Sequence, residues 1–330
     1  MRLGVIAGMG SDWRASLEKV RIAEDLGYEL VTSGESWGPS VLPWLSLLAA
    51  NTSKIQIGPS ILNCFSRSPA VMAQEFASLD QISGGRMIFG IGSSGNLVIE
   101  GYHGVPFERP LRRMREYIEI FNILIGGGRL KYEGEIFKLE RGFSIDYDRP
   151  RDSIPVYIAA ITPRSIEQTG EIADGIFPIH WPRGSFETLR EQLAVGAARA
   201  DRSADAITIA PFTNTYDLDG QDDEQQWRAA RQPLFHYINR MGSFYWQMLS
   251  HNGFEAEVAA SREAWKERDM EGAFDALSEE MVREIQVIGP ADSVREQLQE
   301  RAALGADLQM ISMPEGPPAE AGVRLEALLA

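Results

Sequence analysis

The sequence predicts an α/β protein, a (β/α)8 barrel with insertions. Short apolar runs alternate with amphipathic stretches of helical spacing along the chain, a pattern typical of a parallel sheet covered by helices. Several apolar runs pass directly into loops of small or polar residues, as strands do at the functional face of such a barrel. A plain barrel needs about 250 residues, whereas this chain has 330. One domain spanning residues 1–330 is therefore expected, with the extra length in insertions.

Composition narrows the possible partners. The chain has 32 Lys and Arg against 47 Asp and Glu, a net charge of −15, which opposes binding to nucleic acid or anionic membranes. Cys64 is the one cysteine, so no intramolecular disulfide and no Cys-based zinc cluster is expected. The spacing of the histidines does not match that of metal ligands. No apolar run is long enough to cross a bilayer, and the N-terminus lacks the pattern of an export signal. We expect a cytoplasmic protein that acts on a small molecule without a metal.

The first two strands are expected at residues 2–7 and 30–33. Each is followed by a loop that contains glycine, at Gly8 and at residues 34–38. Between them lies a predicted helix whose apolar side chains recur at helical spacing, namely Leu17, Val20, Ala23 and Leu26. A further helix, at residues 41–50, leads to the third strand.

The stretch from Thr52 to Asn96 predicts one complete βαβ unit. Residues 54–62 form a run rich in β-branched side chains, and Pro69 suits the first turn of the helix that follows. A second strand, at residues 87–91, opens directly into the loop from Gly92 to Asn96. Glycines and small hydroxyls there would let backbone amides approach a phosphate or a ring oxygen. The same loop, taken alone, also fits an ordinary βα turn.

The second half of the chain continues the alternation and carries both insertions. An amphipathic helix is expected at residues 114–125, and a hairpin insertion near residues 130–140. A helical insertion is predicted near residues 217–285, where an apolar stripe either packs on the core or closes over the barrel mouth as a lid. Residues 287–289 are expected to form a connector. The remaining strands are predicted at residues 154–160, 175–179, 207–212 and 308–312.

Chemistry in a barrel lies at the carboxyl ends of the strands. Small, polar or aromatic residues occupy these positions after several separate strands, and we expect them to form one pocket. They are Gly8, Glu35, residues 60–64, residues 92–96, residues 160–162 and His180.

The central unit resembles the luciferase-like flavin and deazaflavin oxidoreductases, which are TIM barrels. The order of residues agrees with that family at Thr52, Ile55, Ile57, Gly58, Arg67, Pro69, Ala73, Leu79, Asp80, Ser83, Gly84, Gly85, Arg86, Gly90, Ile91 and Gly92. Residues 155–175 resemble the family's fifth-strand segment. The resemblance implies an F420-dependent oxidoreductase that moves a hydride between the deazaflavin ring and an organic substrate. The branch similar to methylenetetrahydromethanopterin reductase fits best, because the loop after the second strand is short and lacks a histidine.

Two alternatives remain on the same barrel. One is an FMN-dependent monooxygenase, and the other is a flavin-binding relative without turnover, since no residue is an unambiguous acid or base. Alcohol oxidation is disfavoured, because Ser36 and Gly95 stand where the alcohol and sugar-phosphate dehydrogenases of the family carry a histidine and a glutamate. A homodimer is expected.

The resemblance also implies roles for individual residues. A non-prolyl cis peptide is expected at Ser60-Ile61, beneath the cofactor ring, and Glu35 is placed near that ring, although it also fits a solvated loop carboxylate. Arg164, Arg67 and Arg183 are candidate contacts for the cofactor tail. The predicted catalytic residues are Glu35, Ser36 and His180. The predicted cofactor-binding residues are Gly8, Glu35, Ser60, Ile61, Asn63, Gly92, Ser93, Ser94, Gly95, Ala159, Ala160, Thr162 and Pro163.

Overall fold

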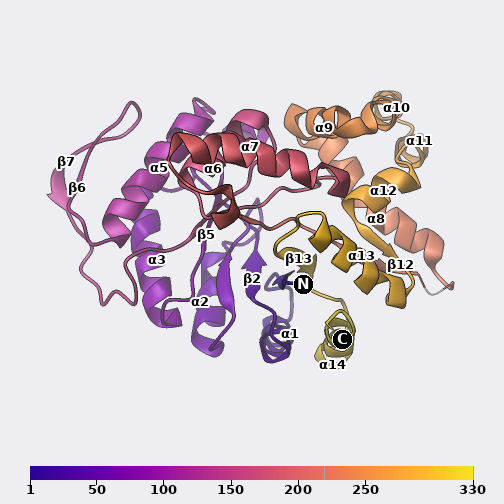
Figure 1. The fold of residues 1–330 in the computed structure, drawn as a ribbon, viewed down its shortest axis with the longest axis horizontal. Coiled ribbons are helices and arrows are strands. Elements are labelled where there is room, and N and C mark those ends of the chain that lie inside the picture. The colour runs from indigo at the N-terminus through magenta and orange to yellow at the C-terminus, as the bar shows by residue number, and fades with distance from the viewer. Residues whose placement is uncertain (219, 330) are drawn as a thin grey trace.

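The computed structural model describes residues 1–218 and 220–329, and its centre is a ring of eight parallel strands (Figure 1). In chain order these are β1 (Leu3–Ile6), β2 (Leu30–Ser33), β3 (Gln56–Pro59), β5 (Phe89–Gly92), β8 (Val156–Ile158), β9 (Gly175–Ile176), β10 (Thr208–Ile209) and β13 (Gln309–Ser312). A short segment, β4 (Leu62–Asn63), continues the third strand beyond a bulge and pairs with β5.

Backbone hydrogen bonds close the ring at two seams. The strands pair in the orders β13-β1-β2-β3 and β10-β9-β8-β5-β4. Between β3 and β5, the Ile88 amide donates to the Ile57 carbonyl at 2.8 Å. Between β10 and β13, the Leu308 amide donates to the Ile209 carbonyl at 3.1 Å. The predicted (β/α)8 barrel is therefore confirmed, and its strand ends form one continuous face.

Helices surround the ring, because their apolar faces pack on the outer side of the strands. They are α1 (Trp13–Leu26), α2 (Leu42–Asn51), α3 (Pro69–Ser83), α5 (Pro110–Ile125), α6 (Pro163–Ile172), α7 (Phe186–Arg199), α13 (Ala291–Ala303) and α14 (Pro318–Ala327). The local sequence determines both ends of helix α3. The Ser68 hydroxyl caps its N-terminus, and Gly84 ends the helix in a left-handed conformation at φ 70°.

Two groups of elements extend from the barrel on opposite sides (Figure 1). One is the antiparallel hairpin of β6 (Leu130–Glu133) and β7 (Lys138–Phe143). The other is helical, and contains α8 (Asp223–Arg240), α9 (Ser243–Leu249), a π-helical turn (Ser250–Phe254), α10 (Glu255–Lys266), α11 (Met270–Asp275) and α12 (Glu279–Ile285). One further short helix, α4 (Asn96–Gly101), follows β5.

Residues 287–289 are not the connector that the sequence suggested. They form strand β12 (Val287–Gly289), which pairs in parallel with β11 (Thr215–Asp217) outside the barrel. Val287 and Ile288 are buried at 1% and 0% exposure. The pairing brings together segments about seventy residues apart, and no local pattern reveals such a partner.

A buried carboxylate ties the hairpin to the barrel. Glu116 on α5 is fully buried, and it accepts hydrogen bonds from the amides of Ile136 and Phe137 at 3.0 Å each. Arg112 donates to the same carboxylate at 2.8 Å. Burial alone would raise the pKa of Glu116, but these donors outweigh it and hold the pKa below its usual range. The hairpin turn is thus fixed on α5.

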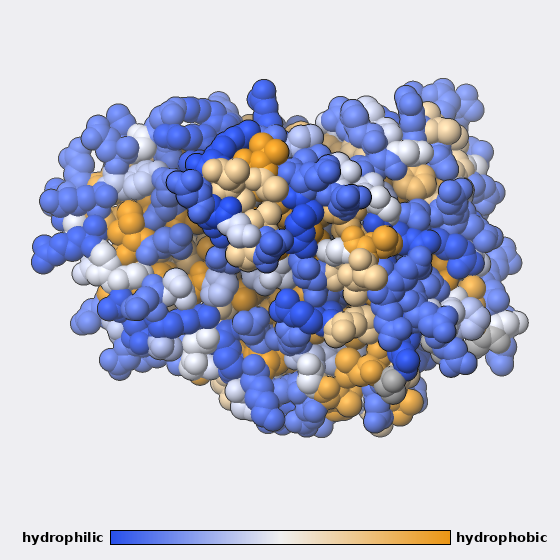
Figure 2. Space-filling model, in the orientation of Figure 1, coloured by the Kyte–Doolittle hydropathy of each residue, from blue (hydrophilic) through white to orange (hydrophobic). Residues whose placement is uncertain are grey.

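The surface in Figure 2 is mostly hydrophilic, with apolar groups in separate patches. In residues 1–218 and 220–329, no helix combines the length and the apolarity that crossing a membrane requires.

Candidate active site

A cavity of about 750 Å³ opens at the carboxyl ends of the strands. Loops after β2, β3, β5 and β8 form one part of its lining, and α8 and α9 form another. Most of the residues predicted for the site line this cavity: Glu35, Ser36, Ser60, Ile61, Gly92, Ser93, Ser94, Gly95, Ala159, Ala160, Thr162 and Pro163. Strand ends that lie far apart in the sequence therefore meet in one place, as the barrel topology requires.

The floor of the cavity depends on close packing between the third and fourth barrel strands. A Cβ added at Gly92 would lie 2.8 Å from Ile61 Cδ1 and 3.4 Å from Ala159 Cβ. A Cβ at Gly90 would collide with the Pro59 carbonyl oxygen. The Ser60-Ile61 peptide is cis, as the resemblance implied. Because Gly92 has no side chain, Ile61 and Ala159 lie next to it, and both line the cavity as an apolar floor.

Glu35 lies at the edge of the cavity in a two-point ion pair. Its two carboxylate oxygens accept from Arg67 at 2.6 and 3.0 Å, and the Val41 amide donates to one of them at 2.9 Å. Only 10% of the Glu35 side chain is exposed. Burial alone would raise the pKa of Glu35, but the Arg67 and Val41 hydrogen bonds outweigh it and hold the pKa below its usual range. Glu35 is therefore an ionised anchor for the loop after β2, and neither a proton donor nor a solvated carboxylate.

Three predicted site residues do not line the cavity. Gly8 is exposed after β1, where the chain is tied to α2 by a hydrogen bond from Trp44 Nε1 to the Ala7 carbonyl. Both polar atoms of the Asn63 side chain already have partners: Oδ1 accepts from the Ser66 amide at 2.8 Å, and Nδ2 lies 3.4 Å from His103 Nε2. His180 is only 3% exposed and lies behind an aromatic residue of α8. Burial lowers the pKa of His180 to about 3, so its imidazole is neutral.

The α8 and α9 part of the lining was not assigned to the site from the sequence. It consists of Tyr237, Met241, Phe244 and Tyr245. The apolar stripe of this region divides: Leu234 and Ile238 are buried in the core, whereas Met241 and Tyr245 face the cavity. Packing on the core therefore describes most of the stripe, whereas Met241 and Tyr245 line the cavity. Tyr237 directly precedes Ile238 of the stripe and is not itself a member of it, so helical spacing did not mark Tyr237 as a cavity residue.

Positive charge reaches the cavity through one arginine. Arg164, in the first turn of α6, is exposed and lines the cavity, whereas Arg67 is paired with Glu35. The third candidate, Arg183, lies elsewhere and pairs with Glu284 at 2.8 Å. Among the residues that line the cavity, all of which the structure describes, Arg164 is the one cation.

These features define the class of protein. A closed (β/α)8 barrel with a large cavity at its strand ends, floored by apolar residues and walled by aromatic ones, is an α/β-barrel enzyme. The sequence profile of the luciferase-like monooxygenase family matches residues 1–308, so the chain belongs to that family.

Individual relatives agree with this assignment. The chain is 31% identical over 312 residues to a 5,10-methylenetetrahydromethanopterin reductase of Archaeoglobus fulgidus, which covers 93% of this chain and 91% of the relative. It is 31% identical over 200 residues to an F420-dependent glucose-6-phosphate dehydrogenase of Nakamurella multipartita, which covers 58% of each chain. The solved structure of a coenzyme F420-dependent tetrahydromethanopterin reductase from Methanopyrus kandleri superposes with a TM-score of 0.83 at 25% identity, covering 99% and 97% of the two chains. The chain is an oxidoreductase of this family, and the predicted family is confirmed.

The ion pair at the cavity edge leads to a first prediction. Replacing Glu35 by Gln removes the charge that holds Arg67, so residues 34–41 should exchange their amide hydrogens faster, and the free energy of unfolding should fall by about 1–3 kcal/mol. The matched control is Glu75→Gln, because Glu75 contacts the same arginine only at 3.6 Å. The pKa of Glu35 is lowered in the folded state, so its contribution to stability is complete above its unfolded pKa and is lost as the pH falls through the folded one. Equal exchange in Glu35→Gln and wild type would contradict this account.

Proposed function

We propose that this protein is an F420-dependent oxidoreductase that transfers a hydride between the deazaflavin ring and a small organic substrate. The observation that carries the proposal is the floor of the cavity, where a Cβ at Gly92 would displace Ile61. An apolar floor without a protruding side chain at Gly92 leaves room for a planar ring system, and Arg164 lines the same cavity, where it could meet a phosphate on the cofactor's tail.

The residues that would hold the cofactor come from three loops. Ser60 and Ile61 would support the ring, while Gly92, Ser93, Ser94 and Gly95 would present backbone groups to its polar edge. Ala159, Ala160, Thr162 and Pro163 would guide the tail toward Arg164. The Ser60 hydroxyl oxygen is buried and has no hydrogen-bond partner among the described residues, so Ser60 would contribute its backbone to this support.

The protein's own contribution to the reaction would be orientation and exclusion of water. When bound, F420 would supply the hydride chemistry. The Glu35 and Arg67 pair would hold the loop after β2 against the ring, and the aromatic residues of α8 and α9 would shield the reacting atoms. Ser36 is exposed at the rim, and no histidine lines the cavity to activate its hydroxyl. We therefore assign Ser36 no acid or base role.

A titration tests the cofactor assignment. Wild-type protein should bind F420, monitored by cofactor fluorescence, and should not bind FMN. Arg164→Gln should weaken F420 binding about ten- to hundredfold, since a charge-assisted contact to phosphate is worth about 1.5–3 kcal/mol. The same change should leave binding of the phosphate-free deazaflavin precursor unchanged. The control is Arg324→Gln, an exposed arginine on α14 outside the cavity. Uptake of FMN without uptake of F420 would instead support the monooxygenase alternative.

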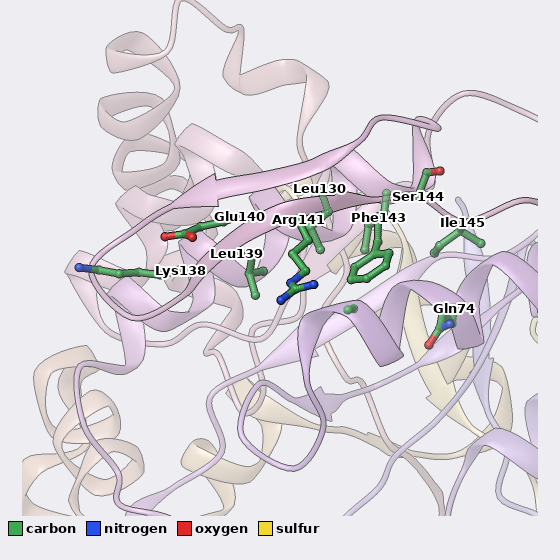
Figure 3. A pocket seen from close by; sticks show the side chains of 11 residues that line it. Gln74, Leu130, Lys138, Leu139, Glu140, Arg141, Phe143, Ser144 and Ile145 are labelled. Atoms are coloured by element: carbon green, nitrogen blue, oxygen red, sulfur yellow. The ribbon is translucent and has the colours of Figure 1, made fainter.

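We also propose that two copies of the chain pair through the hairpin side. A groove of about 540 Å³ lies between α3, α5 and the hairpin, and Figure 3 shows Arg141 and Phe143 projecting from β7 over it. Phe143 is 73% exposed. The groove also carries Lys138, Glu140 and Arg141, so a second copy that covers it would need charges of opposite sign to meet across the contact.

Sedimentation velocity tests the pairing. The wild-type protein should sediment at twice the chain mass of 36.7 kDa. Phe143→Asp should shift it to one chain, because a charge would enter the apolar contact. Val323→Asp is the control, since Val323 is 67% exposed on α14. A monomeric wild-type protein would refute the proposal.

A further inference from the structure

The wall formed by α8 and α9 contains two phenols whose hydroxyls have no hydrogen-bond partner among residues 1–218 and 220–329. Tyr237 and Tyr245 both line the cavity, and their rings meet edge to face with centroids 4.6 Å apart and planes at 72°. Neither hydroxyl has a hydrogen-bond partner within the described parts of the chain, and neither is sealed from the cavity. Polar groups in a largely buried position normally have partners, so these hydroxyls are available to a ligand.

The rings are held in place from behind. His180 packs edge to face on Tyr237, with centroids 4.6 Å apart and planes at 73°. The imidazole is neutral, so it supports the ring without competing for a charged ligand. Burial raises the pKa of both Tyr237 and Tyr245. Both phenols therefore stay protonated. Each can donate a hydrogen bond to a ligand, but neither gives up its proton.

Charge is absent from this part of the lining. The α8 and α9 part consists of Tyr237, Met241, Phe244 and Tyr245, and the same cavity is also lined by the apolar residues Val98, Phe107 and Leu111. Of the charged residues that line the cavity, Glu35 is already neutralised by Arg67, and Arg164 belongs to the α6 side. An anionic substrate group placed among the aromatic residues would be desolvated without a cationic partner, which is strongly unfavourable.

We propose that Tyr237 and Tyr245 select the substrate by donating hydrogen bonds to the carbonyl oxygen or imine nitrogen of an uncharged, planar acceptor. The inference rests on the proposed F420-dependent function and deepens it. Flat rings pack well against edge-to-face aromatic pairs, and two fixed donors give the acceptor one orientation over the cofactor. A sugar phosphate, the substrate class in the name of one relative, does not fit this wall.

The test measures binding to the F420-loaded protein by calorimetry, with 2-cyclohexen-1-one as the uncharged planar probe. Tyr237→Phe and Tyr245→Phe should each weaken binding of this enone about three- to tenfold, the loss expected for one neutral hydrogen bond. Binding of cyclohexene, the same ring without the carbonyl, should be unchanged in both variants. Glucose 6-phosphate should not bind. Tyr102→Phe is the control, since Tyr102 is 58% exposed and lies outside the cavity lining.

The outcomes separate the two proposals. F420 affinity is measured first, and failure of the wild-type protein to bind F420 refutes the proposed function. If F420 binds, three results would overturn the present inference: equal enone affinity in wild type and both variants, equal losses for enone and cyclohexene, or binding of glucose 6-phosphate in place of the enone. Unchanged F420 affinity in the variants excludes a merely structural role for the hydroxyls.

Discussion

The active-site architecture depends on the close approach of the third and fourth barrel strands. The backbone of β3 passes so near β5 that a Cβ at Gly90 would collide with Pro59, and a Cβ at Gly92 would reach Ile61. This approach places the Ile61 side chain beside Ala159 as a floor. The loops, the arginine and the aromatic wall are all arranged around that floor, so a side chain at Gly92 would alter the site as a whole.

Electrostatics divides the cavity into two parts. Glu35 and Arg67 neutralise each other at the edge, which leaves Arg164 as the cation that can attract a phosphate in a chain of net charge −15. The α8 and α9 wall has no charge and two free phenols. This distribution of charge is what the proposed cofactor tail and an uncharged substrate would require.

The sequence was most informative where local pattern and family resemblance agreed. The strands and the loop from Gly92 to Asn96 follow from apolar runs and glycine placement, because these depend on neighbouring residues. The features that the sequence did not predict correctly depend on tertiary contacts. His180 was assigned to the site as a loop residue, but packing against Tyr237 buries it. Asn63 was assigned by its place after a strand, but its side chain caps its own turn. Strand β12 was not predicted, because it forms only by pairing with β11, which lies far away in the chain.

The most direct test of the central claim is the F420 affinity of Gly92→Ala compared with Gly95→Ala. Both glycines line the cavity, but a Cβ at Gly95 would meet only the Met241 carbonyl oxygen at an ordinary 4.0 Å, whereas one at Gly92 would press on Ile61. We expect Gly92→Ala to weaken F420 binding at least tenfold while Gly95→Ala stays close to wild type, with both proteins folded by circular dichroism. Equal F420 affinity in the two variants would contradict the account.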